Sequence, residues 1–188
     1  MTGIDLTDEY CRAAATLAGW VGLGDRVEYR QADALDLPFG ESTFDIAWTQ
    51  HAAMNIPDKA RLYAEAHRVL KPGGRFALYD VLPGPGGPVH FPAPWPREPA
   101  ISHLVTSDEL RRLLEGAGFE IVGWRDTTPA GRDWFIEISR RIRESGLPPL
   151  GHGLLLGPEF ARMAENQRRN LEENRIALIE AVCRKAAS

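Results

Sequence analysis

Residues 27–49 read VEYRQADALDLPFGESTFDIAWT and decide the fold of this chain. The stretch begins with β-branched and aromatic residues at 27–30, which are typical of a strand. An acidic turn that contains Asp33 follows. Residues 44–48 then form a near-continuous apolar run, of the kind found in strands buried on both faces of a parallel sheet. Because ligands of open α/β sheets bind outside the carboxyl ends of such strands, the stretch predicts a binding site beside Asp33.

The segments around this stretch alternate between strand and helix patterns. Residues 2–6 have the pattern of a strand end, and residues 8–18 are Ala-rich and helical. A helix is predicted from residue 58 to residue 70, because apolar side chains recur there at a spacing of 3.6. The next strand is predicted at 75–81. This alternation predicts an α/β fold with a mostly parallel sheet and helices on both faces.

The second half of the chain is less regular, and we expect it to belong to the same single domain, 1–188. A Pro/Gly-rich loop at 83–100 has neither a helical nor a strand period, and loops of this length often bind ligands. We expect a largely helical insertion at 131–173. Residues 176–185 are ambiguous, because their propensity favours a helix, whereas the resemblance described below implies a final strand, which we favour.

Composition excludes several classes of protein. The hydrophobic content of 44% and the charged content of 26% are ordinary for a globular chain. The net charge of −4 gives no basic surface for nucleic acid or an anionic membrane. No apolar run approaches the roughly 18 residues of a membrane span, and we expect a cytoplasmic location. Cys11 and Cys183 lie far apart and the histidines are isolated, so the sequence predicts no metal site.

Three motifs together resemble a known family. They are D-A-x-x-L-P-F at 33–39, F-D-I-A-W at 44–48 and L-K-P-G-G-R-F-A-L-Y-D at 70–80. In these motifs the chain resembles the class I S-adenosylmethionine-dependent methyltransferases of small molecules, from Thr2 to about Thr127. The resemblance implies a Rossmann-like sheet of seven strands. The family's first strand and glycine-rich loop, which would precede Thr2, are absent, so we expect a sheet truncated at its N-terminus.

The resemblance implies a site for the cofactor S-adenosylmethionine. Asp5, with Leu6 beside it, would accept hydrogen bonds from the ribose hydroxyls. Asp33 and Ala34 would bind adenine through a carboxylate and a backbone N–H, and Gln50 would lie near the methionine part. For both aspartates the structural alternative is a local turn or helix cap.

The same resemblance implies a site for a small-molecule acceptor. His51 is the candidate general base, since its pKa lies near physiological pH, although a structural polar role is an equal alternative. Asn55, Asp80 and Trp95 are candidate acceptor contacts, and the alternative for Asp80 is a turn-forming residue. Aromatic side chains of the loop and the insertion are candidate walls of the pocket: Phe91, Trp95 and Trp134.

The absent first strand leads to further expectations. Each buried amide that loses its partner costs about 1–3 kcal/mol, so a whole strand's worth is intolerable. Either the chain comes from a longer enzyme, or the second strand slides against the fourth, or a second copy fills the gap in a homodimer. We expect weak or no cofactor binding by the chain as given. The alternative function is a non-catalytic, methyltransferase-like protein that recruits a partner through its exposed sheet edge.

Overall fold

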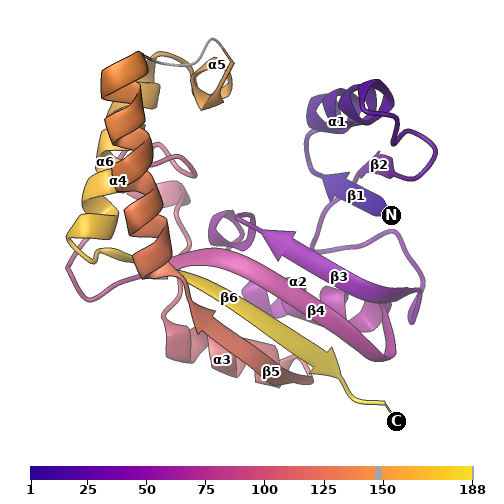
Figure 1. Cartoon of the computed structure of the whole chain (residues 1–188). Helices are drawn as coiled ribbons and strands as arrows, with labels where there is room; N and C mark the ends of the chain where they lie inside the picture. The colour runs from indigo at the N-terminus through magenta and orange to yellow at the C-terminus, as the bar shows by residue number, and fades with distance from the viewer. Residues whose placement is uncertain (147–149, 188) are drawn as a thin grey trace.

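The computed structural model describes residues 1–146 and 150–187, which form two sheets with helices around them (Figure 1). In the smaller sheet, β1 (Thr2–Asp5) pairs in parallel with β2 (Glu28–Gln31). The larger sheet has four strands, in the spatial order β3 (Phe44–Gln50), β4 (Leu70–Pro83), β6 (Ile176–Lys185) and β5 (Phe119–Asp126). Only β6 runs against its neighbours in this sheet, so the fold is α/β with a mixed, mainly parallel strand direction.

Helices lie on the smaller sheet and on both sides of the larger one (Figure 1). The α3 helix (Ser107–Gly116) begins at a capping box, in which the Thr106 hydroxyl accepts the N–H of Glu109 and the Glu109 carboxylate accepts the N–H of Thr106. The helices are α1 (Asp8–Trp20), α2 (Lys59–Val69), α3 (Ser107–Gly116), α4 (Thr128–Ser145), α5 (His152–Leu156) and α6 (Phe160–Glu172), with 3-10 turns η1 (Ala53–Asn55), η2 (Pro99–Ile101) and η3 (Gly157–Glu159).

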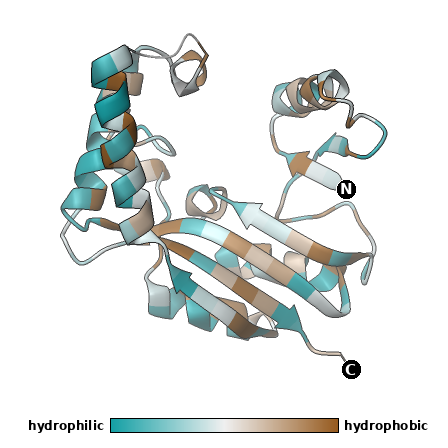
Figure 2. Cartoon of the chain, viewed as in Figure 1, coloured by the Kyte–Doolittle hydropathy of each residue, from teal (hydrophilic) through white to brown (hydrophobic). Residues whose placement is uncertain are grey.

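The main core lies between the larger sheet and the pair α2 and α3. Alternate residues of β4, among them Phe76 and Leu78, are buried against Leu62 of α2 and Leu110 of α3. The apolar residues of β4 and β6 are visible as brown segments in Figure 2. Full burial of such a side chain contributes about 1.5–3 kcal/mol, so this layer stabilises the sheet and fixes which face each strand residue occupies.

The opposite face of the larger sheet is covered only in part. Near the start of β6, Val81 and Leu178 pack against Leu171 of α6. Farther along β3, Ile46 and Trp48 are 61% and 59% exposed. The prediction that residues 44–48 are buried on both faces is therefore wrong for this structure, because no helix among the described residues covers that part of the sheet.

The two sheets do not join. Among the described residues, β1 and β3 form no backbone pairing with each other, so the expected slide of the second strand against the fourth is not observed. At the other side of the larger sheet, residues 176–185 are a strand, which settles the ambiguity of that segment. This segment lies between β4 and β5 and pairs with both, which outweighs its helical propensity.

Candidate functional site

A broad cavity of about 2630 Å³ lies along β1 and β3 and extends to α4, α5 and α6. Small-molecule sites usually measure roughly 300–1,000 Å³, so this cavity has room for a cofactor together with an acceptor. Most of the side chains that the sequence predicts for the site line this one cavity: Asp5, Leu6, Asp33, Ala34, Gln50, His51, Asn55 and Trp95.

Asp5 and Asp33 lie at the ends of two neighbouring parallel strands. The N–H of Ala32 donates to the carbonyl of Asp5 at 3.0 Å and ties the two strand ends together. Oδ1 of Asp5 accepts the N–H of Thr7, and Oδ1 of Asp33 accepts the N–H of Leu35, each at 2.8 Å. Each carboxylate therefore shapes its own turn with one oxygen, and its other oxygen accepts no hydrogen bond among the described residues.

His51 follows β3 in an unusual backbone conformation. Its φ of +51° is in the left-handed region, which few non-glycine residues adopt. Its N–H donates to the carbonyl of Tyr79 at 2.8 Å, and the two rings lie 4.5 Å apart between centroids. Desolvation lowers the pKa of His51 below its ordinary 6.5. The imidazole is therefore neutral near pH 7, which is the form that accepts a proton.

Asn55 lies on the cavity rim in η1, a turn that α2 holds in place. The Lys59 side chain is buried and donates from Nζ to the carbonyls of Ala53, at 2.6 Å, and Ile56, at 3.0 Å. This buried ammonium closes the turn that follows His51. The first turn of α2 thus determines where one end of the cavity lies.

Asp80 is not brought to the cavity, which corrects its predicted place on the rim. Its side chain is buried on the α2 side of β4, and burial raises its pKa to about 6, against the opposing effects of the Val81 N–H and the Lys59 ammonium. Successive strand residues point to opposite faces, so Tyr79, one residue earlier, lines the cavity instead. Sequence reasoning missed Tyr79, although the alternation of apolar residues along β4 was a readable signal.

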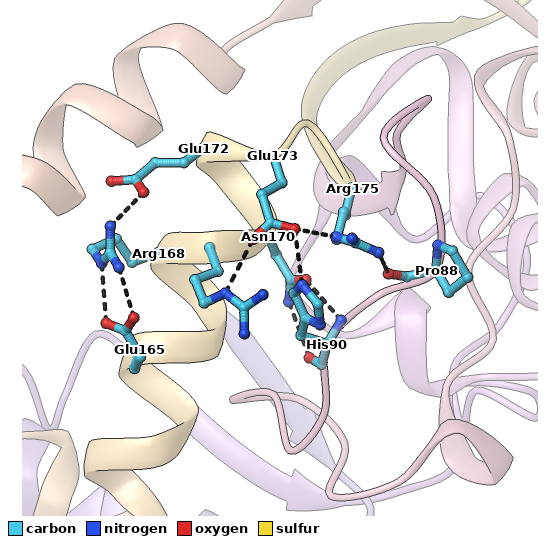
Figure 3. Close-up of polar contacts among 9 residues, drawn as sticks. Pro88, His90, Glu165, Arg168, Asn170, Glu172, Glu173 and Arg175 are labelled. Atoms are coloured by element: carbon cyan, nitrogen blue, oxygen red, sulfur yellow. Dashed lines mark hydrogen bonds and ion pairs between the residues drawn. The ribbon is translucent and has the colours of Figure 1, made fainter.

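The 83–100 loop contributes Trp95 and is held by α6. We call residues 84–96 the strap. The amide of Asn170 on α6, which is fully buried, accepts the N–H of His90 at 2.8 Å and donates to its carbonyl at 3.1 Å (Figure 3). Glu173 accepts from His90 at 2.9 Å and from Arg175, and these hydrogen bonds lower its pKa to about 2. The strap is therefore a braced wall of the cavity.

The aromatic wall of the cavity differs in part from the expectation. Trp95 lines the cavity, and its indole N–H donates to the Ser102 hydroxyl at 3.3 Å. Trp134 of α4 also lines it and is 56% exposed, whereas Phe91 does not contribute. The rest of this side is mixed. Its apolar residues are Ile138, Ile142, Leu154, Leu155 and Phe160, and its charged residues are Arg143, Glu165 and Arg168.

The described residues lack two further kinds of feature. In that part of the chain, no group of three or more His, Cys, Asp or Glu side chains is arranged to hold a metal ion. None of the helices in the same residues is both long enough and apolar enough to cross a membrane.

The known proteins that resemble this chain include methyltransferases. Residues 1–78 match the family model described as a methyltransferase domain. This stretch, 78 of the 188 residues, is similar to a methyltransferase domain. The chain is 32% identical over 154 residues to 27-O-demethylrifamycin SV methyltransferase of Amycolatopsis mediterranei, an alignment that covers 78% of this chain and 56% of that enzyme. The chain thus spans about half the length of the curated relatives that it matches over two thirds or more of its own length.

Solved structures share the fold of this chain. The cyclase SpnF superposes with a TM-score of 0.75 at 25% identity, over all of this chain and 66% of that one. Geranyl diphosphate C-methyltransferase from Streptomyces coelicolor, in complex with S-adenosylhomocysteine, superposes with a TM-score of 0.73 at 16% identity, over 98% of this chain and 62% of that one. The fold is the Rossmann-like fold of these proteins, and geranyl diphosphate methyltransferase binds S-adenosylmethionine or S-adenosylhomocysteine in its solved complexes.

Proposed function

We propose that this chain takes part in the transfer of a methyl group from S-adenosylmethionine to a hydroxyl of an apolar small molecule. The observation that carries the proposal is the convergence of Asp5, Asp33, Gln50 and His51 on one cavity. When bound, the cofactor supplies a sulfonium methyl group, so the protein has mainly to hold the donor and the acceptor in line.

In this proposal the cofactor spans the two strand ends. The free oxygen of Asp5 accepts from the ribose hydroxyls, as an acidic residue does in Rossmann-type sites. Asp33 accepts from the exocyclic amine of adenine, and the Ala34 N–H donates to a ring nitrogen. Gln50, at the end of β3, lies by the methionine part, with Leu6 beside the ribose.

His51 is the proposed general base. Its neutral imidazole lies on the cavity wall beside the Tyr79 ring, where it can take the proton that the acceptor hydroxyl loses during methyl transfer. Asn55 and Trp95 lie on the same wall and are proposed acceptor contacts. Tyr79 replaces Asp80 in this group, because only the tyrosine faces the cavity.

The acceptor is proposed to be apolar because of the far wall of the cavity. Trp134, Leu154 and Leu155 are 56%, 73% and 67% exposed there, which is costly for side chains of this kind unless a ligand covers them. One relative is 27-O-demethylrifamycin SV methyltransferase, whose name gives an organic molecule as the methyl acceptor. This relative supports an oxygen atom of an organic molecule as the acceptor of this chain.

Two further proposals come from the sequence analysis. The chain as given binds the cofactor weakly, because none of its residues matches the family's glycine-rich loop. The alternative function is a non-catalytic protein that associates, with itself or with a partner, at the edges of β1 and β3, which pair on one side only among the described strands. The cytoplasmic location remains a prediction from the sequence alone.

A transfer assay tests the function. The chain is incubated with S-adenosylmethionine carrying a labelled methyl group and either 27-O-demethylrifamycin SV or a small polar alcohol. We expect label in the apolar acceptor only, and a loss of about 100-fold in rate for His51→Gln, within the usual range for a general base. The matched control is His67→Gln, in α2 and packed against Phe119 outside the cavity.

Calorimetric titration with S-adenosylhomocysteine separates the outcomes of this assay. Binding weaker than micromolar, with slow transfer, fits an impaired enzyme. Micromolar binding would overturn the proposed weakness and leave the function standing. No labelled product from either acceptor, together with no binding at all, would reject methyl transfer by this chain.

A further inference from the structure

The segment that carries Asp33 has little regular structure of its own. Residues 32–43 connect β2 to β3 without a helix or strand. Within the segment, the Asp33 carbonyl accepts the N–H of Asp36, and the Leu37 carbonyl accepts the N–H of Phe39. A loop of this kind places a ligand-binding carboxylate accurately only if other elements hold its backbone.

Three side chains of α2 provide that support. Glu65 Oε2 accepts the N–H of Leu37 at 2.9 Å. Arg68 donates to the carbonyls of Phe39, at 2.7 Å, and Leu37, at 2.9 Å. Arg61 donates from Nε to the carbonyl of Leu35 at 2.8 Å. The peptide groups of residues 35–39 are thus bound by side chains that lie 26 to 31 positions later in the chain.

The Glu65–Arg68 pair is itself built to hold one geometry. The carboxylate and the guanidinium make two parallel hydrogen bonds, Nε to Oε1 at 2.8 Å and Nη2 to Oε2 at 2.7 Å. The side chain of Glu65 is only 4% exposed, and its hydrogen bonds with Arg68 lower its pKa to about 2. The pair therefore stays ionised at every pH at which the protein would be assayed.

We propose that Glu65 and Arg68 are positioning residues for the cofactor, because they hold the backbone of residues 35–39 so that Asp33 and Ala34 meet the adenine ring. The inference rests on the proposed function, since it takes adenine as the ligand of Asp33. Lys59 holds the turn after His51 from the same helix, so α2 sets the distance between the adenine end and the transfer end of the site.

Two variants and a matched control pair test this proposal. Glu65→Gln keeps the shape of the side chain and loses its charge. Arg68→Lys keeps the charge, but a single ammonium group cannot donate to all four acceptors of Arg68, which are the two Glu65 oxygens and the carbonyls of Leu37 and Phe39. The controls are Glu137→Gln and Arg140→Lys on α4. That pair has the same i,i+3 spacing and a bidentate contact, but it is exposed and its hydrogen bonds go to side chains rather than to a loop.

The first measurement is hydrogen exchange, which needs no ligand. We expect the amides of Leu35, Asp36, Leu37 and Phe39, above all that of Leu37, to exchange at least about tenfold faster in the Glu65 and Arg68 variants. Peptides from the buried strand β4 report global opening and serve as the internal reference. The α4 control variants should leave the exchange of the loop unchanged.

The second measurement is base discrimination, which a merely structural role would not change. S-adenosylhomocysteine has the exocyclic amine from which Asp33 would accept a hydrogen bond, and S-inosylhomocysteine has a carbonyl oxygen in its place. We expect the unmodified chain and the α4 variants to prefer adenine by about tenfold or more, as for a hydrogen bond to a charged group. The Glu65 and Arg68 variants should lose most of that preference.

The outcomes are distinct. Unchanged loop exchange, or faster exchange with full base discrimination, overturns the positioning role. If the unmodified chain binds neither nucleoside, the proposed function fails for this chain and the cofactor role fails with it. The exchange data then still decide whether the pair holds the loop.

Discussion

At the scale of single residues, β4 shows how much one position matters. Tyr79 lines the cavity beside His51, while Asp80 is buried on the other face against the α2 layer. A carboxyl group there cannot reach the ligand cavity, yet it remains titratable in an apolar setting. In the described residues its Oδ1 atom has no hydrogen-bond partner, which makes its charge costly.

Asp80 is expected to make stability depend on pH. Its pKa rises from 3.8 to about 6 on folding, so the folded state holds its proton more tightly and stability falls as pH rises from about 4 to 6. The full shift corresponds to about 3 kcal/mol. Chemical denaturation of Asp80→Asn should show no such fall in the free energy of unfolding between about pH 4 and pH 6.

The comparison between variants isolates this effect. Desolvation lowers the pKa of His51 and His67, so they act in the opposite direction, raising stability as pH rises toward 6.5. They are common to all variants and cancel in the difference. Asp45→Asn, at an exposed site paired with Lys71, should keep the wild-type dependence. The same wild-type dependence in Asp80→Asn would contradict the assignment.

At the scale of elements, the strap shows how a segment without secondary structure becomes a wall. Gly84 and Gly86 donate to the carbonyls of Arg175 and Asn174, each at 2.8 Å, at the turn between α6 and β6. A Cβ at Gly86 would overlap the Glu173 carbonyl, so only glycine allows this approach. Asn170 then fixes His90 farther along the strap.

Removing the Asn170 amide is expected to loosen the strap. Asn170→Ala leaves the N–H and the carbonyl of His90 without their partner, which costs about 2–4 kcal/mol in the free energy of unfolding. Proteolysis within residues 84–96 should also become faster. Glu165→Ala, which removes only an exposed ion pair with Arg168 on the same helix, should cost less than about 1 kcal/mol. Equal losses in the two variants would argue against a bracing role.

At the scale of the whole molecule, the division into two sheets is the main feature. The β1–β2 sheet and the four-stranded sheet both border the cavity and share no strand pairing among the described residues (Figure 1). Ile46 and Trp48 are exposed on the β3 side of this division. Apolar side chains beside an unpaired strand edge favour association with another chain.

Association through β3 is expected to appear in a size measurement. Sedimentation of the unmodified chain should show a concentration-dependent dimer, and Trp48→Lys should shift it to monomer, because a lysine at an edge strand opposes pairing. Val122→Lys, at an exposed position of the other edge strand β5, is the matched control and should leave the dimer intact. A stable monomer at all concentrations would count against this interface.

The sequence by itself determined the order of the elements and brought most of the predicted site residues to one cavity. The strand patterns at 27–31 and 44–49 are local, and residues that follow parallel strands necessarily gather at one edge. For this reason the amino-acid sequence alone was enough to place Asp5, Asp33 and His51 beside one cavity.

Only the tertiary structure decided which face each side chain takes and what braces the loops. Tyr79 and Asp80 differ by one position, and their assignment depends on where α2 packs. The contacts of Glu65 with Leu37 and of Asn170 with His90 join residues 28 and 80 positions apart. Local periodicity carries no information about such pairs, because they form only after the helices and the sheet have come together.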